Sequence, residues 1–195
     1  MPMDWSTPPR GVLKAGTAEV RAVREPDETG GGHAADGSAP PVSPGEAQAL
    51  PLFSVPLAVL AKRGPEALGK AKRRGWRLLV DEGGTVKLVD HINKTGVASM
   101  SSGSALDHLL AAGEKAAREI EADEATYQPR VLEFGRLGRS ALWLHAPDPE
   151  VKDRFFTVSA EPEEVSGADF LAEAAEQAQA RLAAAGESDD SEIGG

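Results

Sequence analysis

The chain contains no cysteine, few aromatic residues and no long hydrophobic run. Without cysteine it cannot form a disulfide framework, a thiolate zinc site, an iron–sulfur cluster or a cysteine nucleophile. No apolar segment approaches the ~20 residues that cross a bilayer. The first residues lack the basic and apolar regions of a secretory signal. We therefore expect a soluble, cytoplasmic protein that has no membrane partner.

Hydrophobic residues make up 41% of the 195 residues, which is too many for a wholly disordered chain. Residues 26–46 are different, because they are rich in Gly, Pro, Ser, Ala and acids. Such a segment cannot bury enough apolar surface to offset the entropy of ordering it. We predict a flexible arm and linker over 1–50, one globular domain over 51–186 and a disordered acidic tail over 187–195. Within the arm, the alternating residues 17–23 are an alternative short strand or docking motif.

The domain is expected to begin with a basic helix over 65–74, since Pro65 suits a first helical turn and Gly75 suits a helix end. A β-hairpin is predicted over 76–89, because two runs of β-forming residues flank a turn that contains two glycines. Residues 91–103 are polar and are predicted to form a loop.

Two amphipathic helices are predicted, over 104–123 and 168–185. Each starts with a serine three residues before an aspartate, Ser104 with Asp107 and Ser166 with Asp169, which is typical of a helix cap. Apolar and small residues recur at helical spacing in both segments. In the first they are Leu106, Leu109, Leu110, Gly113, Ala116, Ala117 and Ile120, and in the second Phe170, Leu171, Ala174, Ala175, Ala178 and Leu182.

Strands are predicted over 130–134, 140–145 and 154–158. Adjacent strands between helices indicate an α+β fold, with a mostly antiparallel sheet of about five strands packed by the two long helices. The order of elements is similar to that of roadblock and profilin-like domains, in element order alone.

Charge is unevenly distributed along the chain. Residues 62–77 hold seven bases against one acid, Glu66, whereas residues 151–195 hold eleven acids against three bases. The basic segment predicts electrostatic contacts with an acidic partner protein. The expected partner-binding residues are Lys70, Lys72, Arg73, Arg74 and Arg77.

Two further partners fit the sequence. Two helices followed by the hairpin would have the order of a winged helix, in which the basic segment binds nucleic acid. Against this stand the overall charge of −10 and the acids Asp81 and Glu82 at the tip of the hairpin. A second copy of the chain could pack against the small residues of helix 168–185.

No catalytic, cofactor-binding or metal site is predicted. Residues 64–70 match part of a phosphate-binding loop, but Ala71 stands where the loop needs a hydroxyl for Mg²⁺. The histidines have no metal-ligand spacing. Asp90 and His91, followed by the serines of the polar loop (Ser99, Ser101, Ser102 and Ser104), are the best acid–base candidates. The leading hypothesis is a non-catalytic interaction or adaptor module; nucleic-acid binding and a small hydrolase that uses Asp90, His91 and the serines are the alternatives.

Overall fold

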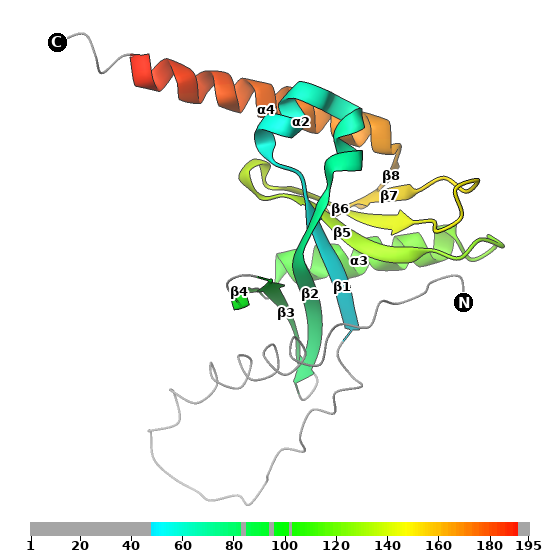
Figure 1. Cartoon of the computed structure of the whole chain (residues 1–195). Helices are drawn as coiled ribbons and strands as arrows, with labels where there is room; N and C mark the ends of the chain where they lie inside the picture. The colour runs from blue at the N-terminus through cyan, green and yellow to red at the C-terminus, as the bar shows by residue number, and fades with distance from the viewer. Residues whose placement is uncertain (1–47, 83–84, 94–95, 102, 191–195) are drawn as a thin grey trace, which may run out of the picture.

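One eight-stranded sheet organises the molecule, in a computed structural model that describes residues 48–82, 85–93, 96–101 and 103–190 (Figure 1). The strand order is β4-β3-β2-β1-β5-β6-β7-β8. Every neighbouring pair is antiparallel except β1 and β5, which run parallel. The α+β class and the mostly antiparallel sheet are therefore confirmed.

The first half of the chain forms one side of the sheet. Its elements are β1 (Gln48–Ser54), α2 (Leu57–Arg63), the 3-10 helix η2 (Gly64–Lys70), β2 (Lys72–Glu82), β3 (Thr85–Ile92) and β4 (Gly96–Ser101). The hairpin predicted over 76–89 is confirmed, because β2 pairs with β3 with Leu78 opposite Val89 and Val80 opposite Lys87. Its two turn residues, 83 and 84, lie outside the described residues.

The second half forms the other side. Its elements are α3 (Ser104–Glu119), β5 (Gln128–Phe134), the 3-10 helix η3 (Gly135–Leu137), β6 (Arg139–His145), β7 (Arg154–Thr157), β8 (Glu164–Val165) and α4 (Gly167–Asp190). The strands predicted over 130–134, 140–145 and 154–158 correspond to β5, β6 and β7.

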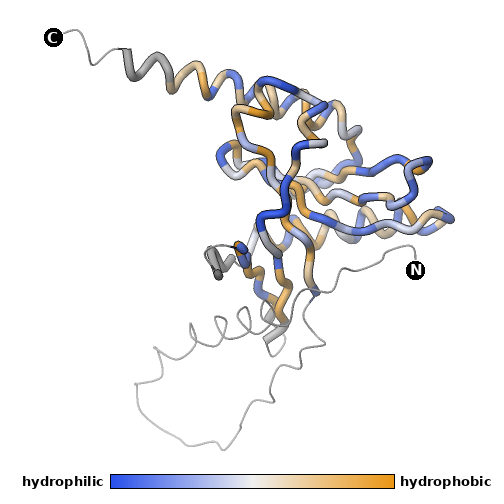
Figure 2. The backbone as a smooth tube through the Cα atoms, in the orientation of Figure 1, coloured by the Kyte–Doolittle hydropathy of each residue, from blue (hydrophilic) through white to orange (hydrophobic). Residues whose placement is uncertain are grey.

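Helices lie on both faces of the sheet (Figure 1). On one face α3 packs on side chains such as Leu52, Val131 and Leu142. On the other face α2, η2 and α4 pack on alternate residues of the same strands, such as Leu132, Trp143 and Phe155. Apolar residues therefore point both ways from the central strands, and Figure 2 shows hydrophobic stretches along them.

Two local predictions were wrong. Residues 65–74 do not form a helix: η2 ends at Lys70, and β2 starts at Lys72 because Arg73 and Lys72 pair with Phe53 and Ser54 of β1. The loop predicted over 91–103 contains β4, which extends the sheet beside β3. The alternative of a winged helix does not fit the described residues either, since the hairpin lies inside the eight-stranded sheet.

The domain limits also differ from the prediction. The first strand begins at Gln48, inside the predicted arm, and α4 continues past Gly186 to Asp190, into the predicted tail. The remainder of the predicted arm, including the alternative strand over 17–23, and residues 191–195 lie outside the described residues.

The helical stripes are confirmed in part. In α4 the predicted residues Phe170 to Ala178 are buried, but Leu182 is 39% exposed. In α3, Leu106, Leu109 and Ala116 are buried, while Leu110 is 40% exposed because the sheet-facing side of the helix passes through Ala112 instead.

One of the two predicted helix caps is confirmed and the other is wrong. Ser166 caps α4 as expected, accepting a hydrogen bond from the backbone of Asp169 at 3.0 Å. Ser104 does not cap α3; Gly103, with a φ of 74° that favours glycine, precedes the helix. Within the described segments, no helix has the length and apolar character needed to cross a membrane.

Candidate functional site

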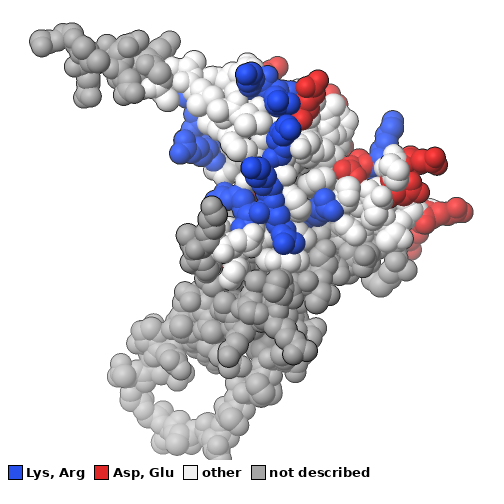
Figure 3. Space-filling view, in the orientation of Figure 1, with Lys and Arg blue, Asp and Glu red and all other residues white. Residues whose placement is uncertain are grey.

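Six exposed bases lie on consecutive elements of one side of the molecule. They belong to the last turn of α2, the end of η2 and the start of β2, and we call them the basic surface. Its residues are Lys62, Arg63, Lys70, Lys72, Arg73 and Arg74. Figure 3 shows Lys and Arg gathered over these elements, whereas Asp and Glu gather over the loop that joins β6 to β7.

The first residues of β2 contain a local irregularity in their pairing with β1. The pairing of β1 with β2 shifts between Leu52 and Phe53, so that Leu52 lies opposite Gly75 and Phe53 opposite Arg73. Arg74 is therefore an extra residue in the ladder, a β-bulge of the kind that re-aims side chains at a strand end. The guanidinium of Arg73 stacks over the Trp76 ring, 5.3 Å from its centroid, which restrains its position.

Arg77, the fifth predicted partner-binding residue, does not belong to this surface. It is 8% exposed and lies on the α3 face of the sheet. Its Nε and Nη2 donate to the two carboxylate oxygens of Asp90 at 2.7 and 2.8 Å, and Glu133 lies 3.6 Å away. Burial opposes the charged form, but the contacts with Asp90 and Glu133 prevail and raise the pKa of Arg77. Its charge is thus used within the fold.

The same ion pair bears on the predicted acid–base residues. Asp90 is held by Arg77 rather than by its neighbour His91. Nδ1 of His91 is buried and has no hydrogen-bond partner in the part of the chain that the structure describes. The side chains of Ser99, Ser101 and Ser102 lie outside the described ones, and Ser104 is exposed at the start of α3. The structure therefore does not bring Asp90 and His91 together.

A different histidine is oriented by a carboxylate. Nδ1 of His145, at the end of β6, lies 3.1 Å from Asp153, which also accepts hydrogen bonds from Nε1 of Trp143 at 2.7 Å and the backbone of Ala146 at 2.9 Å. This contact was not predicted from the sequence, because Asp153 comes from the loop before β7. The alternation of Trp143 with His145 on one strand face is the only signal of it in the sequence.

Arg130 adds a cation beside this cluster. Its guanidinium lies over the rings of Trp143, at 4.9 Å, and Phe53, at 5.1 Å. Burial lowers the pKa of Arg130, and the charge of Asp153 opposes that change. An oriented imidazole beside an arginine is an arrangement that can exchange a proton or bind an anion.

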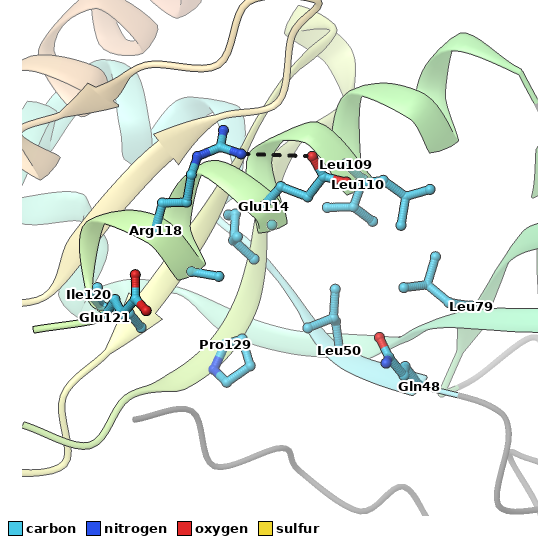
Figure 4. A pocket seen from close by; sticks show the side chains of 13 residues that line it. Gln48, Leu50, Leu79, Leu109, Leu110, Glu114, Arg118, Ile120, Glu121 and Pro129 are labelled. Atoms are coloured by element: carbon cyan, nitrogen blue, oxygen red, sulfur yellow. Dashed lines mark ion pairs between the residues drawn. The ribbon is translucent and has the colours of Figure 1, made fainter. Parts of the chain in front are cut away.

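An apolar pocket of about 670 Å³ separates part of α3 from the sheet (Figure 4). Figure 4 shows Leu50, Leu79 and Pro129 of the strands facing Leu109 and Leu110 of α3. Charged residues of α3 stand at its edge, where Arg118 and Glu114 form an ion pair at 4.0 Å. The volume lies within the range of small-molecule sites.

Metal binding has no visible basis in the described segments, where no three His, Asp or Glu side chains come together in a way that could hold an ion.

Comparison with known proteins adds no further assignment. No family model, no curated protein and no solved structure matches the chain.

Proposed function

We propose that this protein is a non-catalytic interaction module whose basic surface binds an acidic segment of another protein. The observation that carries the proposal is the exposure of the six bases and their lack of acidic partners. Each is exposed, and none forms an ion pair with an acid in the described part of the chain.

Two arginines in the second half of the chain differ from these bases, because each forms an ion pair with an acid of the fold. Arg139 pairs with Glu173 at 2.7 Å, and Arg154 pairs with both Asp123 and Glu164 at 2.9 and 2.6 Å. The hydrogen bonds that Arg154 donates to the Glu164 carboxylate are the main reason that the pKa of Arg154 is raised. The fold thus neutralises Arg139 and Arg154, whereas the six bases of the basic surface have no such acid in the described part of the chain and are available to a partner.

Exposed cations act mainly through the rate and specificity of association. Each exposed ion pair contributes only ~0.2–1 kcal/mol, so several must act together. A surface of one sign accelerates encounter with a surface of the opposite sign, and salt screens this effect. The lack of cysteine is compatible with a reducing compartment, and we place the proposed interaction in the cytoplasm.

The test compares two variants with equal changes of charge. Lys72→Glu/Arg74→Glu alters the basic surface, whereas Lys152→Glu/Arg181→Glu alters exposed bases elsewhere. Binding of a labelled polyglutamate peptide, measured by fluorescence anisotropy at low salt, should fall strongly in the first variant only. An equal fall in both variants, or binding unchanged in the first, would reject the proposal.

Nucleic acid is the competing ligand for the same surface. A labelled DNA duplex titrated in parallel distinguishes the two ligands. For DNA, the logarithm of the binding constant falls linearly with the logarithm of the salt concentration. If the protein binds the duplex much more tightly than the peptide, the acidic-protein proposal is replaced by nucleic-acid binding. Light scattering in the same buffers reports whether a second copy binds through α4, where Leu182 is exposed.

A further inference from the structure

The face of β1, β2 and β3 that lies opposite α3 carries a cluster of apolar side chains. Its members are Ala49, Trp76, Leu78, Val80 and Val89. None of them is more than 4% exposed, and Val89 is wholly buried. Side chains on the face of a sheet become buried to this degree only when another layer covers them.

None of the described helices belongs to this cluster. The helices α2 and α4 pack with η2 over β5, β6 and β7, and α3 lies on the other face of the sheet. Figure 1 agrees, because α2 and α4 lie near one end of the sheet while β2 and β3 extend away from them. The layer that covers the cluster therefore comes from outside the described residues.

We propose that residues 12–23 of the same chain cover this face, with Val12, Leu13, Val20 and Val23 against the cluster. Residues 1–47 are the longest segment that the structure does not describe. They lead directly into β1, which contains Ala49. They also supply the apolar side chains that a covering layer needs. The proposal does not depend on the function proposed for the basic surface.

The connecting segment has a suitable length. Residues 26–46 are rich in Gly, Pro and Ser, and a linker of about 21 such residues has an average end-to-end distance of roughly 25 Å. That distance resembles the length of β1, about 23 Å for seven residues. Such a tether holds the segment at an effective concentration in the millimolar range, so that modest apolar contacts suffice for docking.

The covered face adjoins the basic surface. Trp76 belongs to the apolar cluster, and the guanidinium of Arg73 stacks on the same ring. A segment docked against Trp76 would therefore end beside the basic surface. Residues 10–24 contain four bases and one acid, so the docked segment would add cations there.

The absence of cysteine allows a direct test in the full chain. A nitroxide attached to Thr17→Cys should broaden the methyl resonances of Leu78, Val80 and Val89, and should leave that of Leu182 in α4 sharp. Val20→Asp/Val23→Asp should remove this broadening, because it places two charges in the apolar contact. Ser38→Asp/Val42→Asp, which adds the same charge within the linker, should retain it.

Two results would overturn the proposal. Sharp methyl resonances at Leu78, Val80 and Val89 in the labelled protein would show that residues 12–23 do not lie on this face. In a second experiment, chains that carry the nitroxide are mixed with isotope-enriched chains that lack it. If the methyl resonances of the enriched chains broaden to the same extent, the covering segment belongs to a second copy. Broadening within one chain, lost in Val20→Asp/Val23→Asp alone, supports it.

Discussion

Arg77 holds Asp90 by two hydrogen bonds, Nε to Oδ1 at 2.7 Å and Nη2 to Oδ2 at 2.8 Å, across the paired strands β2 and β3. The side chains are only 9% and 13% exposed. The pair removes one residue from the predicted partner-binding set and another from the predicted acid–base pair. Arg77 is therefore largely buried within the fold, and Asp90 is oriented toward Arg77 instead of His91.

Arg77→Met should destabilise the protein by about 3–5 kcal/mol, because it removes the guanidinium that forms a bidentate ion pair with the largely buried Asp90 carboxylate. Arg139→Met removes a more exposed pair and should cost no more than about 1 kcal/mol. Urea unfolding measures both. Adding Asp90→Asn to Arg77→Met should restore part of the lost stability, and no restoration would show that the pair is not the cause.

Gly75→Ala should destabilise the fold by more than about 3 kcal/mol. A Cβ atom at Gly75 would lie 1.9 Å from the backbone oxygen of His91 on β3, so that the strands would have to separate. Gly113→Ala in α3 meets no atom within 4 Å and should stabilise the helix by roughly 0.5–1 kcal/mol. Thermal unfolding of the two variants should shift in opposite directions.

Asp153→Ala should cost about 1–3 kcal/mol, since it leaves the indole N–H of Trp143 without an acceptor. The chemical shift of that indole proton, followed by NMR, should change at the same time. Asp148→Ala, which removes one exposed contact with the backbone of Glu150, should change stability by no more than about 0.5 kcal/mol. Equal losses in the two variants would contradict this account of Asp153.

The pocket beneath α3 should bind an apolar dye such as anilinonaphthalene sulfonate, because cavities lined by apolar side chains accept apolar molecules. Ala117→Trp places an indole in the pocket and should reduce the dye's fluorescence. Ala105→Trp adds the same group on an exposed position of α3 and should leave the fluorescence due to the pocket unchanged. Unaltered fluorescence in Ala117→Trp would place the dye elsewhere.

Lys115 should make the stability of the protein depend on Glu119 at acidic pH. Its hydrogen bond lowers the pKa of Glu119 below the usual value of about 4.5. The folded state therefore favours the carboxylate, and this contribution is present above the unfolded pKa and lost as pH falls through the folded one. In Lys115→Met, an NMR titration should show the pKa of Glu119 returning toward 4.5. An unchanged titration would assign the shift to another group.

Elements with strong local patterns were predicted well. The hairpin has two glycines at its turn and β-forming residues on both sides, and Ser166 and Asp169 form the cap that their spacing indicates. Strand β4 was missed because its sequence, GVASMS, has no apolar periodicity, and its structure depends on pairing with β3. Local propensity carries no information about such a partner.

The candidate site was predicted only in part. The density of bases in residues 62–77 is a property of the sequence, and most of them are exposed. The exception, Arg77, was not foreseeable, because its burial depends on Asp90 and Glu133 from two other strands. The contact of His145 with Asp153 was missed for the same reason. Acids that are distant in sequence therefore determine which basic side chains are free to bind a partner. The topology of the sheet brings these acids close to the bases.

Within the sheet, the parallel contact of β1 with β5 is the junction between strands that are distant in sequence. Only three residue pairs form this ladder, Leu52 with Val131, Phe53 with Leu132 and Ser54 with Glu133. All other neighbouring strands are close in sequence, so each half can form by short loop closures, whereas this junction closes a much longer loop. We therefore expect the joining of the two halves, along β1 and β5 and between α2 and α4, to be the entropically costly step of folding, and its rate should limit how quickly newly made chains mature.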